Sequence, residues 1–386
     1  MEIPFFKEDL IRKGLLVFIA SLSGGMVAFF ANLIIANMLL PTSTYSFGMF
    51  KTIIYLFTFL PSIIDLGIST SLTKYVAEFK EYSKKKHVIR WFLKIKFVAY
   101  VFLILAIFLF KDYIAFYFTK DVSNNYLVIA GTFLAISSFF TTFNAIVLGL
   151  KNFKLFSLSL FLGSTLPAVF AVLLSSFGIF YMTLGWGIGF IAGSMPNILY
   201  LFRKRIFSGY RKVDVKKLFF RFSLPIFPIE LTGALFGSIV PLLSLFFSQK
   251  LISYYSFAFM FYWAAQLVPS SLSSVMFPTI SGLSGLGRHE NAKSILRKTF
   301  LYYGLFAVIG FIFVLLFSDW FISVVSANYL PSLYMFKVIV SLSFLFGFNV
   351  IYASYLKGLG KVKKYALFVL AQNILLLAIS FIILSM

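Results

Sequence analysis

The sequence predicts an all-α integral membrane protein made of two parallel-repeat helical lobes, with about six plus five transmembrane helices around a central cavity. Three observations lead to this fold class: the composition, the order of apolar runs and basic clusters, and an internal repeat. Of the 386 residues, 61% are hydrophobic, 20% are aromatic and only 12% are charged. Soluble domains contain roughly 45–50% apolar residues, so this composition excludes an ordinary soluble enzyme.

Apolar runs long enough to cross a bilayer follow one another along the whole chain. A membrane-spanning helix needs about 20 mostly apolar residues, and eleven runs of about that length are separated by charged or turn-forming segments. The first run is longer than the core of a signal peptide and has no small-residue cleavage site after it, so we expect it to stay as a membrane helix. The expected spans are residues 14–40, 47–71, 92–110, 126–149, 155–176, 178–202, 218–248, 252–280, 299–317, 330–355 and 365–386.

Basic residues gather between these runs and set the expected orientation. The chain has 34 Lys and Arg against 12 Asp and Glu, a net charge of +22. If the chain crosses eleven times, the positive-inside rule predicts a protein of the cytoplasmic membrane, with its N-terminus in the cytoplasm and its C-terminus outside. This distribution indicates contact with membrane lipids or an anionic substrate, and no nucleic-acid partner is expected. Six basic clusters then share one side of the membrane: Lys7–Lys13, Lys74–Lys96, Lys151–Lys154, Arg203–Arg221, Arg288–Lys298 and Lys357–Lys364.

The second half of the chain repeats the first at a shift of about 209 residues. An even number of spans precedes the second copy, so the two copies are expected to be parallel and related by an axis along the membrane normal. The repeat predicts a six-span N-terminal lobe at 1–203, a basic cytoplasmic connection at 204–217, and a five-span C-terminal lobe at 218–386 whose sixth helix is missing. The matches are Tyr45-Ser46-Phe47 with Tyr255-Ser256-Phe257, Pro61-Ser62 with Pro269-Ser270, and the Gly149…Lys154 turn with Gly358…Lys363.

The sequence also excludes most metal and redox chemistry. It contains no Cys, and its two His residues, His87 and His289, lie in separate charged segments. Neither a thiolate site nor a His cluster can therefore hold zinc. The sequence has no Gly-x-x-x-x-Gly-Lys-Ser/Thr phosphate loop. We expect no metal, no cofactor and no ATP-driven step in this chain.

Several motifs along the chain resemble those of one transporter family. They are Pro41 with Tyr45–Gly48, Asp65-Leu66-Gly67, Tyr75–Glu78, the group Phe222, Leu224 and Pro225, and the turn VLGLKNFK. Together they resemble the polysaccharide-export, or oligosaccharide flippase, branch of the multidrug/oligosaccharidyl-lipid/polysaccharide exporter superfamily. The resemblance implies a flippase that carries a polyprenyl-(pyro)phosphate-linked oligosaccharide across the cytoplasmic membrane by alternating access, for surface polysaccharide or glycoconjugate assembly. It departs from the family's pattern at the C-terminus, where family members have further spans.

A flippase breaks no covalent bond, so no catalytic residue is expected, and the informative residues are polar groups inside spans. Lys51 and Lys337 each lie about one turn inside the outer end of a span. Either they bind a phosphate or sugar, or their amines extend to the outer interface. Amides are also costly in lipid and are expected to face the interior. The amides taken as cavity candidates are Asn32, Asn37, Gln266 and Asn349.

Two carboxylates within spans have different expected roles. Glu230 lies about 11 residues into its span, roughly 16 Å from the cytoplasmic edge and near the midplane. It is a candidate site for coupling to H⁺ or Na⁺, or else a buried pair or a hydrogen-bonded neutral acid. Asp65 is close to the inner end of its span, just before Gly67, and is expected to cap or tie down a bend.

Glycines and prolines within spans are candidates for hinges. Gly24 and Gly25 correspond to Gly233 at the repeat shift, and Pro225 with Pro228 would interrupt helical hydrogen bonding. These residues either permit bending during transport or allow close helix packing.

Other functions fit parts of the pattern. A cation-coupled multidrug exporter of the same superfamily would need an intramembrane acid, and the first span has none. From other classes, a membrane glycosyltransferase would need acidic residues on a sizeable outer loop, and a non-transporting remnant or scaffold would explain the missing helix.

Overall fold

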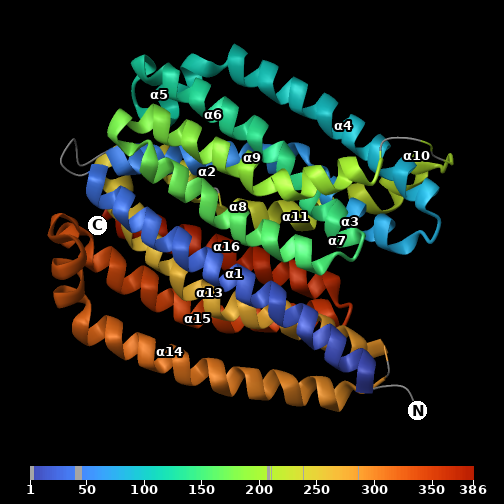
Figure 1. Ribbon diagram of the computed structural model, residues 1–386. Helices are drawn as coiled ribbons and strands as arrows, with labels where there is room; N and C mark the ends of the chain where they lie inside the picture. Colours follow the sequence, from blue (N-terminus) through green and yellow to red (C-terminus); the bar gives the residue numbers. More distant parts are fainter. Residues whose placement is uncertain (1–3, 40–45, 207–208, 210, 238, 286) are drawn as a thin grey trace. The chain divides into compact units, whose positions relative to one another are not determined.

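The computed structural model describes residues 4–39, 46–206, 209, 211–237, 239–285 and 287–386, and every regular element in this part of the chain is a helix. The predicted all-α class is confirmed. The α-helices are α1 Pro4–Leu39, α2 Ser46–Ile64, α3 Ile68–Glu78, α4 Tyr82–Leu109, α5 Lys111–Thr119, α6 Asn125–Ser138, α7 Thr142–Gly149, α8 Phe153–Leu173, α9 Ile179–Arg203, α10 Val215–Leu218, α11 Leu224–Gly237, α12 Ile239–Ser244, α13 Gln249–Gly285, α14 His289–Ser326, α15 Leu333–Gly358 and α16 Val362–Ser385. The chain runs through them in the order that the colours of Figure 1 follow.

The described residues contain nine helical stretches that are long and apolar enough to cross a membrane. One stretch, His289–Gly358, holds both α14 and α15, joined by the 3₁₀ turn Ala327–Ser332. The expected span 218–248 is divided into short pieces, among them the π-helix Phe219–Ser223 and α11. Pro225 and Pro228 explain part of this division because neither has an N–H to donate to the preceding turn. The division into six plus five spans stays a prediction.

By their internal contacts, the helices form two compact units. The α1/α13–α16 unit consists of residues 1–48 and 247–386, and the α2–α12 unit consists of residues 49–246. The boundaries of these units differ from the boundaries of the lobes that the sequence repeat predicts. Helix α1 belongs with α13–α16, and α11 belongs with α2–α9. The lobes 1–203 and 218–386 therefore stay a prediction drawn from the repeat.

Helix ends follow the 209-residue register of the repeat. Helix α7 ends at Gly149 and α15 ends at Gly358, while α8 begins at Phe153 and α16 begins at Val362. The turn between each pair has one residue with positive φ, Lys151 at 60° and Gly360 at 73°, again 209 residues apart. The same local sequence thus gives the same helix–turn–helix in both copies.

In the α1/α13–α16 unit, α15 packs against α13, α14 and α16, and α1 packs against α13. Gly25 of α1 permits this last approach, because a Cβ there would collide with the side chain of Leu267. Gln266 ties α13 to α15 by donating to the Ser343 carbonyl at 2.6 Å. Helix α14 lies beside α15 (Figure 1), and many of its large apolar side chains are exposed.

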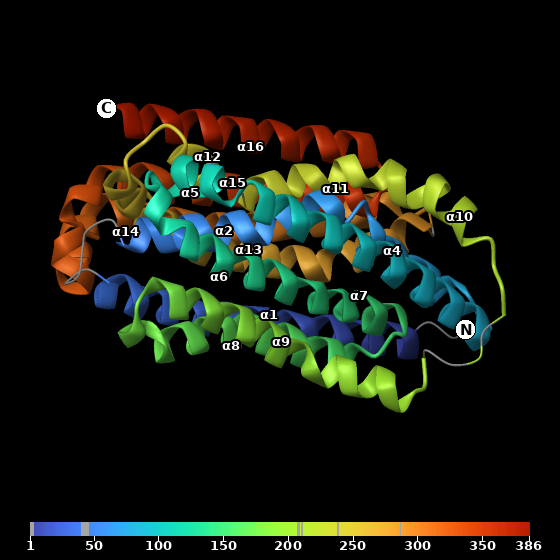
Figure 2. The same ribbon diagram turned by 90° about the horizontal axis from the view of Figure 1, so that it is seen from above.

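In the α2–α12 unit, α8 and α9 run side by side in both views (Figures 1 and 2). Gly185, Gly189 and Gly193 recur every four residues along α9 and bring its backbone against that of α8. A Cβ at Gly193, for example, would lie 2.7 Å from the Gly163 Cα. This small-residue stripe is the packing device that membrane helices use where side chains would hold them apart.

Large apolar side chains remain exposed along the helices with the highest hydropathy. On α4 these include Phe97, Phe102 and Leu109, which are 61%, 68% and 78% exposed. A soluble protein would bury such side chains, whereas a bilayer solvates them. With the nine apolar helical stretches of the described residues, these surfaces make the chain a multi-pass membrane protein.

Candidate functional site

The candidate site begins where the second expected span bends. Helix α2 ends at Ile64, and Leu66 and Gly67 both have positive φ, 49° and 70°, before α3 begins at Ile68. The Asp65 carboxylate holds this bend, because it accepts hydrogen bonds from the Ser69 N–H at 3.1 Å and the Ser69 hydroxyl at 2.9 Å. The expectation that Asp65 ties down a bend agrees with these contacts.

Lys96 of α4 forms an ion pair with Asp65. Its Nζ also lies 3.1 Å from the Ser69 Oγ. The Lys96 side chain is 5% exposed and that of Asp65 is 16% exposed, so the pair is held inside the α2–α12 unit. The positive-inside rule places Lys96 in a cytoplasmic basic cluster. Its position on the inward face of α4 shows that it serves the interior of the bundle.

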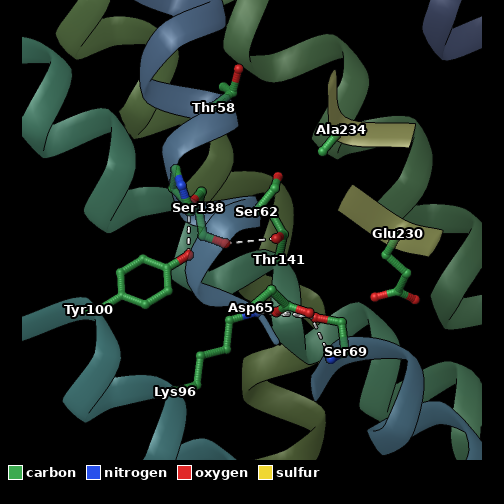
Figure 3. Close-up of a pocket in the computed structure, with 11 residues that line it drawn as sticks. Thr58, Ser62, Asp65, Ser69, Lys96, Tyr100, Ser138, Thr141, Glu230 and Ala234 are labelled. Atoms are coloured by element: carbon green, nitrogen blue, oxygen red, sulfur yellow. Dashed lines mark hydrogen bonds and ion pairs between the residues drawn. The ribbon is translucent and has the colours of Figure 1, made fainter. Parts of the chain in front are cut away.

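Hydroxyl groups surround this ion pair. The Tyr100 hydroxyl lies 2.9 Å from the Ser138 Oγ, and Thr141 donates to the Ser138 carbonyl at 2.7 Å. With the ion pair they line a cavity of about 260 Å³, hereafter the polar pocket. Figure 3 shows Lys96 and Tyr100 reaching it from one side and Glu230 from the other. The lining residues are Thr58, Pro61, Ser62, Asp65, Ser69, Lys96, Tyr100, Ser138, Thr141, Glu230 and Ala234.

Glu230 brings a second carboxylate to the polar pocket. It comes from α11, is half-buried, and accepts a hydrogen bond from the Thr70 hydroxyl of α3. Pro228 lies two residues earlier, inside α11. Thr70 directly follows Ser69, so the first turn of α3 is bonded to both carboxylates of the pocket.

Lys51 lies away from the polar pocket but inside the same unit. It is buried, with 4% of its surface exposed. Its Nζ faces the rings of Tyr55 at 5.8 Å and Trp186 at 5.6 Å, a distance at which aromatic faces attract a cation. The amine is therefore enclosed by aromatic side chains in this structure.

Lys337 has a different environment. Its Nζ lies 3.3 Å from the Asp319 Oδ2 of α14, and the two side chains are 33% and 63% exposed. Pairs this exposed contribute little to stability. The structure thus gives Lys337 a surface carboxylate partner, while Lys51 has an aromatic enclosure.

The four candidate amides are spread over the α1/α13–α16 unit. Asn32 donates to the Ala28 carbonyl at 2.7 Å, one turn back in α1. Asn37 is exposed and donates to the carbonyls of Leu33 at 3.1 Å and Val325 at 3.4 Å. Gln266 is buried and joins α13 to α15, and Asn349 is half-buried on α15. These contacts do not join the four side chains to one another, so their role in a cavity stays a prediction.

The hinge candidates divide into two groups. Gly24 and Gly25 are in the uninterrupted helix α1, and Gly25 makes the close contact with Leu267. Pro225, Pro228 and Gly233 are all exposed, and a Cβ at Gly233 would have no heavy atom within 4 Å among the described residues. A Cβ at Gly25 would thus displace the end of the Leu267 side chain, whereas the described surroundings of Gly233 leave room for one.

A helical pattern in the sequence could have revealed Lys96. Phe92, Lys96 and Tyr100 are spaced four residues apart, so they share one face of a helix. All three are buried, while Lys94 and Phe97 on other faces are exposed. A lysine on an apolar, inward face needs a partner, and an acid on a neighbouring span is the natural choice.

The fold and the site together define the class: an all-helical, multi-pass membrane protein whose bundle holds a charged and hydroxyl-rich pocket. Within that class, the chain belongs to the polysaccharide biosynthesis protein family, whose model matches residues 10–284. A comparison with curated proteins gave no match.

Solved structures share the fold over nearly the whole chain. The lipid II flippase MurJ in an inward closed conformation has a TM-score of 0.74 at 16% identity, covering 96% of this chain and 86% of that one. An inward-facing multidrug resistance MATE family transporter of the MOP superfamily has a TM-score of 0.67 at 12% identity, covering 97% and 93%. An outward-facing MATE family transporter has a TM-score of 0.63 at 12% identity, covering 97% and 95%. The family model confirms the resemblance to a polysaccharide-export family that the sequence indicated, and these solved structures share the fold.

Proposed function

We propose that the protein translocates a polyprenyl-(pyro)phosphate-linked oligosaccharide across the cytoplasmic membrane by alternating access, with its N-terminus in the cytoplasm. The family description and the MurJ-like fold support a transporter of saccharide-bearing lipids. The single observation that carries the proposal is the polar pocket, which sets an ion pair and several hydroxyls inside a bundle with lipid-facing apolar surfaces. Burying charged groups inside a membrane-spanning bundle costs free energy, and such groups are typical of the path that a transported substrate or ion takes.

The chemistry of the polar pocket suits part of a glycan. Thr58, Ser62 and Thr141 offer hydroxyls that can exchange hydrogen bonds with sugar hydroxyls. Lys96 offers a cation that a phosphate oxygen or a sugar hydroxyl could share with Asp65. About 260 Å³ is slightly below the roughly 300 Å³ at which small-molecule pockets usually begin. The pocket would therefore hold one portion of the glycan, with the lipid tail left in the bilayer.

The test compares the two leaflets of the membrane in cells with and without the protein. Intact cells are treated with a membrane-impermeant glycosidase, and the lipid-linked oligosaccharide that it cleaves is measured by mass spectrometry against the total pool. We expect cells lacking the protein to accumulate lipid-linked oligosaccharide that the glycosidase cannot reach, and the 386-residue chain to restore access. An unchanged accessible fraction in the deletion would contradict the proposal.

A second candidate, a cation-coupled multidrug exporter, is favoured by the two carboxylates of the polar pocket, Asp65 and Glu230. The likeness to MATE transporters supports it as well. Against it, Asp65 is paired with Lys96, which lowers the attraction of the pocket for a cationic drug. Unchanged glycan access combined with increased sensitivity to cationic dyes in the deletion would favour this candidate.

Glu230→Gln tests whether Glu230 couples transport to a proton or ion gradient. Gln can keep the bond with Thr70, but it can neither take up nor release a proton. We expect transport by the wild-type chain to change with pH, and transport by Glu230→Gln to lose this dependence. Initial rates in vesicles at several pH values measure it, with Glu78→Gln, an exposed acid of α3, as the matched control. Identical pH profiles for both variants would remove Glu230 from the coupling role.

Lys51→Ala and Lys337→Ala test the two cations named from the sequence. If both bind substrate, each variant should transport several-fold more slowly at an unchanged amount of folded protein. The environments favour a larger effect for Lys51, which is enclosed by aromatic rings, than for Lys337, which already has Asp319. Transport rate per folded molecule is the measurement. Normal rates for both variants would mean that these lysines only anchor their helices.

A further inference from the structure

An apolar groove opens on the exposed face of the α1/α13–α16 unit, between α14 and α15. Its volume is about 580 Å³, and its walls are aliphatic and aromatic. Several wall residues are among the most exposed large apolar side chains of the described residues, including Leu301 at 64%, Ile309 at 69% and Leu345 at 59%. The lining residues are Phe300, Leu301, Gly304, Leu305, Ala307, Val308, Ile309, Phe311, Phe344, Leu345 and Phe348. We call this the α14–α15 groove.

A glycine keeps the floor of the α14–α15 groove open. A Cβ at Gly304 would lie 3.7 Å from the Phe348 ring, in ordinary contact, so the ring borders a space that a larger side chain would fill. Along α14 the groove extends from Phe300 to Phe311. At about 1.5 Å per residue this is roughly 17 Å, close to half of the ~30 Å hydrocarbon core. The groove thus has the length of one leaflet.

A basic residue stands at one end of the α14–α15 groove. Arg297 is exposed and lies four residues before Leu301 and eight before Leu305, so all three share one face of α14. Arg297 belongs to the segment from Arg288 to Lys298, which has four basic residues and one acidic residue, Glu290. The end of the groove nearest this segment therefore carries positive charge, and the rest of its wall is apolar.

We propose that the α14–α15 groove binds an acyl chain of an anionic phospholipid, with the headgroup phosphate on Arg297. The apolar wall matches the chain, its length matches one leaflet, and the charge at its end matches the phosphate. A guanidinium binds phosphate through a planar pair of N–H groups, which fixes the headgroup better than a diffuse basic surface does. The residues of this groove belong to another unit than those of the polar pocket.

The test measures lipid retention by the full chain. The protein is reconstituted in nanodiscs with equal amounts of phosphatidylglycerol and phosphatidylcholine, and the lipids that stay bound are counted by native mass spectrometry. We expect the wild-type chain to retain phosphatidylglycerol preferentially, and Arg297→Gln to lower that preference about fivefold, as expected for one basic residue at a membrane surface. The matched control is Lys94→Gln, which removes an exposed lysine from α4. It should leave the preference unchanged.

Gly304→Leu tests the apolar part of the α14–α15 groove independently of Arg297. Filling the floor should lower retention of both phospholipids while the melting temperature in detergent stays close to the wild-type value. Equal effects of Arg297→Gln and Lys94→Gln, or no loss of retention with Gly304→Leu, would overturn the proposal. Displacement of phosphatidylglycerol by equimolar polyprenyl monophosphate would instead assign the groove to a carrier lipid. A dimer in detergent that Gly304→Leu dissociates would assign it to a second copy of the chain.

Discussion

Replacing Lys96 by Met is expected to lower the free energy of unfolding by about 3–5 kcal/mol, because removal of one partner leaves the other charge buried and uncompensated. The Asp65 carboxylate would keep only the two bonds from Ser69. Its side chain is 16% exposed, so water can replace little of the lost ion pair. Thermal and denaturant unfolding of the detergent-solubilised chain measure the effect. The matched control, Lys94→Met on an exposed face of α4, should change stability by less than about 0.5 kcal/mol.

The double variant Asp65→Asn/Lys96→Met distinguishes stability from transport. Asn retains an oxygen that can accept the Ser69 N–H bond, while the unpaired charge is gone, so most of the lost stability should return. If the ion pair also serves the proposed transport, the double variant will be folded but inactive. Recovery of both stability and transport would make the pair purely structural. Lys96→Met with wild-type stability would show that the ion pair does not hold the bend.

Much of the fold could be predicted because membrane helices leave a strong local signal. Runs of apolar residues predict the helices. The 209-residue repeat predicts that α7 and α15 end at equivalent positions, and that α8 and α16 begin at equivalent positions. The helix boundaries within 218–248 were harder to predict. Hydropathy indicates which residues lie in lipid, but it contains no information about where backbone hydrogen bonds are interrupted. There Pro225 and Pro228 break an apolar run into a π-helix and α11. The grouping of α1 with α13–α16 depends on contacts distant in sequence, such as that of Gly25 with Leu267.

The site could be predicted only in part, for a related reason. Asp65 and Glu230 were recognisable as acids within spans, and the Asp65 bend could be expected from the following Gly67. The helical spacing of Phe92, Lys96 and Tyr100 indicates a buried lysine. Its pairing with Asp65, and that of Thr70 with Glu230, depend on tertiary contacts between helices that no linear motif encodes. Lys96 is also one of eight basic residues in its cluster. The positive-inside rule accounts for such a cluster without requiring an acidic partner for any of its members.

Replacing Gly67 by Ala is expected to lower the free energy of unfolding by about 2–5 kcal/mol, the sum of backbone strain and overpacking. Gly67 has φ +70°, a conformation that L residues with a side chain adopt only under strain. A Cβ there would also collide with the Ser223 carbonyl oxygen and lie 2.8 Å from the Ile226 Cγ2. Neither neighbour can move freely, because one is backbone and the other is in α11. The yield of monodisperse protein and its melting temperature measure the loss.

Gly233→Ala is the matched control. The same reasoning on φ and on the space for a Cβ predicts that this variant is not destabilised. Gly233 lies within α11, its φ is not positive, and beyond its chain neighbours and its own helix backbone no described heavy atom is within 4 Å of an added Cβ. Ala is favoured over Gly inside a helix by about 0.5–1 kcal/mol, so this variant should be slightly more stable than the wild-type chain. If Gly233→Ala is stable yet transports slowly, Gly233 acts as a hinge, since only flexibility has been removed. If Gly67→Ala is as stable as the wild type, the Asp65-Leu66-Gly67 bend does not need a glycine, and its conformation does not fix the geometry of the polar pocket.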